Sequence, residues 1–184
     1  MFGDNSSEEA VLYYLYMMAD GNISYSEEKI FNELCGKLHL SVEAQKEAIK
    51  KCRDITSNMT DIFRVIVKEK IDDQAGRTFY GLRHDSSLAR IIWNLVCLGY
   101  ADSGYSQEEK KIVEYLIDKW SVKPEVYQEF IDIADTMLAL TKQKRWLDNN
   151  FSVGAEKDKK EKEIDIEMKR LLDDVKLTID EIMM

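Results

Sequence analysis

Residues that bend or cross-link a backbone are scarce in this chain. Its 184 residues include one proline, eight glycines, three cysteines and two histidines. Because strands need turn residues more often than this, the composition predicts an all-α fold. The cysteines are odd in number and widely spaced, which fits neither a disulfide framework nor a zinc-ligand pattern. No apolar run approaches the ~18 residues of a membrane span, so we expect neither a membrane-spanning nor a disulfide-rich secreted protein.

The chain is short of positive charge. It has 26 Lys plus Arg against 35 Asp plus Glu, a net charge of −9. Phosphate contacts are made by clustered Lys and Arg, so the charge predicts no nucleic-acid partner. We expect the local basic cluster Lys142, Lys144 and Arg145 to be a solvated face or to contact acidic neighbours. The first ten residues are acidic where a signal peptide is basic, which predicts a cytoplasmic protein.

Apolar spacing predicts where the helices lie. A first helix is expected from about Ser7 to Ala19, a second after Ser24, and a third from near Ser41 that continues through Val67. Gly21 is expected to end the first helix in the left-handed conformation. Residues 72–85 have no clear period and predict a loop. A strongly apolar helix is expected from Ser86 to Ala101.

An internal repeat appears when the chain is shifted by 82 residues. Leu12–Ile49 then aligns with Asn94–Ile131 without a gap, with identities that include Ala19/Ala101, Asp20/Asp102, Ser24/Ser106, Glu27/Glu109 and Leu34/Leu116. The repeat predicts two helical hairpins packed face to face about a pseudo-twofold axis. We expect a helical domain at 1–150, a linker at 151–155 and an amphipathic C-terminal helix at 156–184. That helix is expected to fold back on its own domain, with self-association or partner binding as the alternative.

The paired acidic residues of the repeat are its strongest chemical feature. In each copy an Asp ends one helix and a Glu lies in the first turn of the next: Asp20 with Glu27, and Asp102 with Glu109. If the copies face each other, up to four carboxylates converge. Such hard oxygen ligands suit Ca²⁺, Mg²⁺ or Mn²⁺ better than soft metals.

A purely structural interpretation stays open beside the metal site. Ser24 with Glu27, and Ser106 with Glu109, have the spacing of capping boxes, which satisfy the amides of a helix start. An Asp before a glycine is an ordinary turn residue. An EF-hand is rejected, because its sixth position would be Tyr25 and its twelfth Phe31.

The two acidic elements resemble those of the TerB-like family of tellurite-resistance proteins, which shares a domain with DjlA-type co-chaperones. The resemblance rests on Met18–Ile30 (MADGNISYSEEKI) and Ala101–Ile112 (ADSGYSQEEKKI) and covers about residues 8–150. It implies an all-α domain of about seven helices with the acidic residues of both elements on one surface. Family members are linked to metal or metalloid stress and to membrane-associated complexes, without established catalytic chemistry.

These observations favour a non-catalytic interaction module that binds a divalent cation at the paired acidic turns. The alternative is an assembly protein that acts through its C-terminal helix, with the acidic turns only capping helices. An enzyme that uses the clustered carboxylates is a minor alternative, because neither His39 nor His84 belongs to a di-iron pattern and no activated nucleophile is evident. We expect a protein partner or self-association, with peripheral association with a membrane complex left open.

Overall fold

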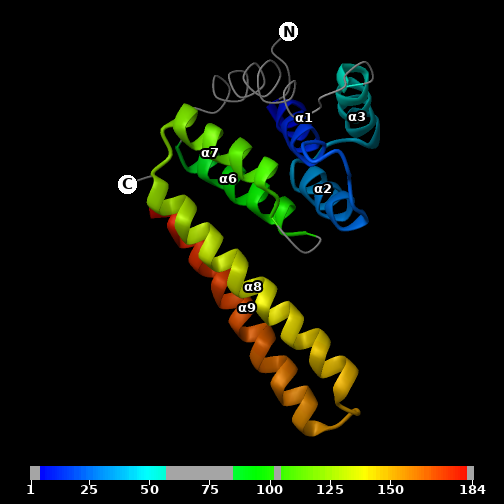
Figure 1. Ribbon diagram of the computed structural model, residues 1–184, viewed down its shortest axis with the longest axis vertical. Helices are drawn as coiled ribbons and strands as arrows, with labels where there is room; N and C mark the ends of the chain where they lie inside the picture. Colours follow the sequence, from blue (N-terminus) through cyan, green and yellow to red (C-terminus); the bar gives the residue numbers. More distant parts are fainter. Residues whose placement is uncertain (1–4, 57–84, 102–104, 182–184) are drawn as a thin grey trace.

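The computed structural model of the chain describes residues 5–56, 85–101 and 105–181. These residues form seven α-helices and no strand, which confirms the all-α prediction (Figure 1). The helices are α1 (Asn5–Met17), α2 (Tyr25–Lys37), α3 (Val42–Thr56), α6 (Asp85–Gly99), α7 (Gln107–Trp120), α8 (Pro124–Asn150) and α9 (Ala155–Glu181). No described helix has both the length and the apolar content of a membrane span. The expected continuation of the third helix and the loop before residue 85 lie outside the described residues.

The helix bounds follow the 82-residue repeat. Shifting α1 and α2 by 82 gives 87–99 and 107–119, and the observed α6 and α7 span 85–99 and 107–120. Likewise, α3 begins at Val42 and α8 at Pro124. The pseudo-twofold axis between the copies stays a prediction.

Even the helix ends match between the copies. After α2, His39 adopts φ 55° and Leu40 N–H donates to the Cys35 carbonyl at 3.1 Å. After α7, Ser121 adopts the same φ and Val122 N–H donates to the Ile117 carbonyl at 3.0 Å. Both patterns are Schellman motifs, which satisfy the last carbonyls of a helix. Gly21, with φ 82°, takes the predicted left-handed conformation after α1.

Helix α1 lies at the centre of the molecule. It packs against α2, α3, α6 and α7, and every side chain from Glu9 to Met17 is buried. Tyr13, Tyr14 and Tyr16 point to several faces of this helix, and all three are buried. A helix surrounded on all sides is buried on every face. The Tyr13 hydroxyl donates to Glu9 and accepts from Asn94, so its polar end has partners inside the core.

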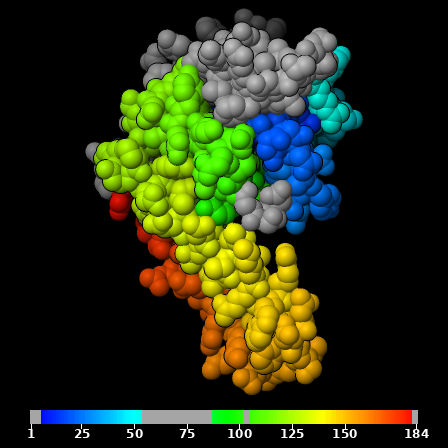
Figure 2. All heavy atoms as spheres, in the orientation of Figure 1, coloured from blue at the N-terminus to red at the C-terminus, as the bar shows by residue number. Residues whose placement is uncertain are grey.

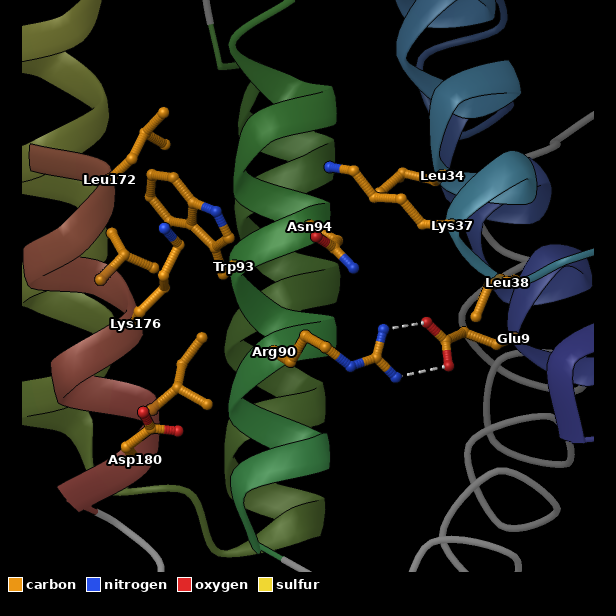
Figure 3. A pocket seen from close by; sticks show the side chains of 12 residues that line it. Glu9, Leu34, Lys37, Leu38, Arg90, Trp93, Asn94, Leu172, Lys176 and Asp180 are labelled. Atoms are coloured by element: carbon orange, nitrogen blue, oxygen red, sulfur yellow. Dashed lines mark hydrogen bonds and ion pairs between the residues drawn. The ribbon is translucent and has the colours of Figure 1, made fainter. Parts of the chain in front are cut away.

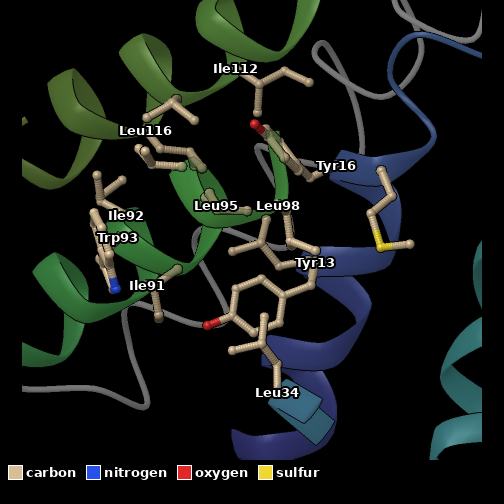
Figure 4. Close-up of a cluster of buried hydrophobic side chains, with 14 of the residues drawn as sticks. Tyr13, Tyr16, Leu34, Ile91, Ile92, Trp93, Leu95, Leu98, Ile112 and Leu116 are labelled. Carbon is tan, nitrogen blue, oxygen red and sulfur yellow. The ribbon is translucent and has the colours of Figure 1, made fainter. Parts of the chain in front are cut away.

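The core fills the space between α1, α2, α6 and α7 (Figure 4). Large apolar side chains of α6 and α7 meet the tyrosines of α1 there, among them Ile91, Leu95, Leu98, Ile112 and Leu116. The strongly apolar sequence of α6 thus reflects contacts with α1, α2, α7, α8 and α9.

Helices α8 and α9 pair along their length and project beyond the other helices (Figures 1 and 2). Residues 151–154 connect them. Val175 of α9 is buried in the core and Ile164 is also buried, which confirms that the C-terminal helix folds back on its own chain. Lys144 Nζ lies 2.6 Å from Asp165 Oδ1 across the hairpin, so this member of the basic cluster has the expected acidic neighbour.

Candidate acidic site

The acidic turn of the first copy is a short reversal between α1 and α2. Asp20 is exposed, and its Oδ1 accepts a hydrogen bond from the Asn22 backbone N–H at 2.9 Å. This closed Asx turn, followed by the left-handed Gly21, brings the chain to the start of α2. Asp20 therefore has a local structural role, as the turn interpretation predicts.

The two glutamates form complete capping boxes. At α2, Ser24 N–H donates to Glu27 Oε2 at 2.7 Å, and Glu27 N–H donates to Ser24 Oγ at 3.1 Å. At α7, Ser106 N–H donates to Glu109 Oε2 at 2.8 Å, and Glu109 N–H donates to Ser106 Oγ at 3.2 Å. The predicted capping boxes are confirmed in both copies, and each uses one carboxylate oxygen.

Both capping glutamates are buried, which a surface cap does not require. Glu27 is 4% exposed and Glu109 is 5% exposed. Burial raises the pKa of the Glu109 carboxyl to about 7, although the hydrogen bonds from Ser106 lower it, and the charges of Glu27 and Asp20 raise it further. The fold therefore brings acidic residues of the first copy close enough to act on the glutamate of the second.

The predicted four-carboxylate set is only partly described. Asp20, Glu27 and Glu109 are seen, whereas Asp102 lies outside the described residues. Among the residues that are described, no three His, Cys, Asp or Glu side chains form a group able to hold a metal ion. Among the described residues, no hydrogen-bond donor contacts Oε1 of Glu109.

A tyrosine cluster borders Glu109. The charge of Glu109 contributes to raised pKa values of Tyr16 and Tyr105, for which burial is the main cause. The hydroxyls of Tyr105 and Tyr127 lie 3.2 Å apart. Gly99 makes room for the cluster, because a Cβ there would lie 2.5 Å from Tyr105 Cδ2 and 2.6 Å from the Tyr16 hydroxyl. The close approach of these tyrosines explains why a glycine occupies position 99. No pattern in the sequence indicates this contact.

The ion pair between Arg90 and Glu9 is a second feature that the sequence does not reveal. Its two nitrogen–oxygen distances are 2.7 and 2.8 Å, and Glu9 is 3% exposed. The residues are 81 positions apart and belong to α6 and α1. Their pairing satisfies a carboxylate that faces the core.

Comparison with known proteins identifies the family. No curated protein and no solved structure matches the chain. The model of the family described as Tellurite resistance protein TerB matches residues 7–133, more than half of the chain. The match begins within α1, contains α2, α3, α6 and α7, and ends within α8. Because the match covers more than half of the chain, this protein belongs to the TerB family.

Proposed function

We propose that this TerB-family protein is a non-catalytic interaction module whose paired acidic turns bind a divalent cation, in the context of metal or metalloid stress. The observation that supports the proposal is that the capping glutamates of both copies, Glu27 and Glu109, are buried, and that the charges of Glu27 and Asp20 help to raise the pKa of Glu109. The described carboxylates do not by themselves form a metal-binding group, so the proposed site also needs Asp102, and a cation held there would relieve the repulsion between the negative charges. Ca²⁺, Mg²⁺ and Mn²⁺ are the candidates because all the donors are oxygens.

The capping boxes are compatible with ion binding. Each box engages Oε2, which leaves Glu109 Oε1 as a ligand, and Asp20 is exposed to solvent. The proposal assigns Asp102 as the fourth ligand. Capping would then orient the glutamates as outer-shell hydrogen bonds orient metal ligands elsewhere.

Calorimetric titration with each of the three cations tests the proposal. We expect binding heat and a raised melting temperature for the wild type, and loss of both in the Asp20→Asn/Asp102→Asn variant. The matched control is Asp158→Asn/Asp180→Asn, which removes the same charge from exposed positions of α9. Absence of heat and of any melting shift in the wild type would show that the turns only cap helices.

A second candidate function is assembly through the C-terminal hairpin, either with a second copy or at a membrane-associated complex. Ile166 and Leu177 of α9 are large apolar side chains about 60% exposed, and the hairpin projects from the other helices (Figure 1). Deleting residues 156–184 would remove this surface, but it would also expose the core that Val175 covers. The sharper test is therefore Ile166→Lys/Leu177→Lys, which leaves the buried face intact. Light scattering should give a smaller mass for this variant, and an unchanged mass would exclude self-association through that face.

A further inference from the structure

A groove runs along the outer face of α6. None of the residues that form the hydrogen bonds of the acidic turns lines it. It consists of two cavities of about 700 and 310 Å³ that share Trp93 as a lining residue. The first reaches Arg90 of α6 and the second reaches Ala101. At 1.5 Å per residue the floor from Arg90 to the end of α6 at Gly99 is about 14 Å long, which matches about two and a half turns of a helix laid along it. We refer to the two cavities together as the α6 groove.

The walls of the α6 groove are apolar and come from helices distant in sequence. Helix α2 forms one wall with Ile30 and Leu34, together with Leu38 just after the helix. The other wall begins with Val175 and Ile179 of α9 and continues with Met137 and Leu138 of α8. Three helices thus enclose an apolar channel, the kind of surface into which an amphipathic helix lays its apolar face.

The charge of the α6 groove is opposite to that of the chain. Five cationic residues line it against two acidic ones, whereas the whole chain has a net charge of −9. Glu9, one of the two acids, is neutralised by Arg90.

Three of the cations are available to a ligand. Lys37, at one wall, and Lys142 and Arg145, at the end on α8, have no acidic partner among the described residues. Lys176 pairs with Asp173 at 2.7 Å, outside the lining. Figure 3 shows Lys37 extending from α2 toward α6, and Lys176 of α9 beside Trp93 on the opposite side of α6.

We propose that the α6 groove binds an acidic amphipathic helix of a partner protein. Leucine-type side chains spaced three and four apart would enter the channel along α6, and acidic residues beside this stripe would reach Lys37 at one end and Lys142 with Arg145 at the other. The charge complementarity selects an acidic ligand over a basic one. This surface does not depend on ion binding at the acidic turns.

Two synthetic helices of about 18 residues serve as probes. Both carry leucines at i, i+3, i+4 and i+7, and their remaining positions are glutamate-rich in one and lysine-rich in the other. Fluorescence anisotropy of labelled peptides should show about tenfold tighter binding of the acidic peptide. The difference should shrink at about 1 M salt, where exposed charges are screened. Equal affinities, or no binding of the acidic peptide, would overturn the proposal.

Charge reversal locates the binding surface. Lys37→Glu/Lys142→Glu/Arg145→Glu should weaken binding of the acidic peptide about tenfold. The three side chains are exposed, so the fold should be retained, as circular dichroism can verify. The control Lys46→Glu/Lys50→Glu/Lys162→Glu makes the same charge change at exposed positions outside the groove, and should alter binding by no more than about twofold. A control that weakens binding as much as the test variant would refute the assignment.

Two further measurements distinguish a partner helix in the α6 groove from binding by surface charge alone and from a second copy of this chain. Met137→Asp places a charge in the apolar wall and should abolish binding, and unchanged affinity would mean that the peptide binds only by surface charge. Light scattering should give the same mass for the wild type and for Lys37→Glu/Lys142→Glu/Arg145→Glu. A dimer that Lys37→Glu/Lys142→Glu/Arg145→Glu dissociates would identify a second copy of this chain as the occupant and overturn the partner-helix proposal.

Discussion

Replacing Glu109 by Gln should stabilise the folded protein above neutral pH. The pKa of this carboxyl rises from its ordinary value of 4.5 to about 7, chiefly because burial disfavours the charged form. Gln keeps a side-chain oxygen that can accept the Ser106 N–H, so the capping box survives while the buried charge is removed. The variant therefore isolates the cost of ionising Glu109.

Proton linkage gives the direction in which the stability of the folded protein changes with pH. Between pH 4.5 and 7 the folded state holds the Glu109 proton more tightly than the unfolded state. The stability that this proton contributes is complete below 4.5 and is lost as pH rises through 7. An unscreened rise of this size corresponds to about 3 kcal/mol, and we expect about 1–2 kcal/mol because solvent screening and local relaxation reduce the cost of the buried charge.

Urea unfolding at about pH 5 and pH 8, in the presence of a chelator, measures the effect. The difference between Glu109→Gln and the wild type should be small at the lower pH and reach about 1–2 kcal/mol in favour of the variant at the higher. Glu108→Gln, at the neighbouring position in the first turn of α7, is the control with the same change of charge. The reasoning fails if Glu109→Gln changes stability equally at both pH values, or destabilises the protein at pH 8.

Four further substitutions test packing, backbone conformation and the buried ion pair. Gly99→Ala should destabilise the protein by about 1–3 kcal/mol, because its Cβ would overlap two tyrosine side chains. Gly36→Ala, where nothing lies within 4 Å of the added Cβ, should stabilise it by about 0.5–1 kcal/mol, and thermal unfolding of both variants compares the two sites. Ser121→Gly should stabilise by up to about 1 kcal/mol because φ is 55° there, and an unchanged or lower midpoint in urea would contradict that strain. Arg90→Met should cost about 3 kcal/mol by leaving the carboxylate of Glu9 buried without its cation. The Glu9→Gln/Arg90→Met double variant should recover part of this loss, and a double-mutant cycle measures how much.

Sequence patterns predict the structure reliably where a few neighbouring residues determine it. Ser24 and Ser106, each three residues before a glutamate, predict helix starts because the capping interaction closes within four residues. The 82-residue repeat predicts the second helix start from the first for the same reason. The family resemblance rests on these short elements and agrees with the TerB match over residues 7–133.

Burial of the three tyrosines in α1 was not predictable from its sequence. Their positions around the helix suggest several environments, and only the packing of α2, α3, α6 and α7 shows that all of these are interior. The Glu9–Arg90 pair was likewise hidden, because 81 residues separate partners that only tertiary packing brings together.

The scarcity of proline and glycine, together with the spacing of the apolar residues, was enough by itself to determine a helical protein, and the repeat was enough to mark equivalent acidic turns. These are properties of residues a few positions apart. Tertiary structure alone decided that Glu109 is buried near the acidic residues of the first copy, and that cations from α2 and α8 border one apolar groove on an acidic protein. Burial and charge environment depend on which helices pack together, and that packing joins residues distant in the chain.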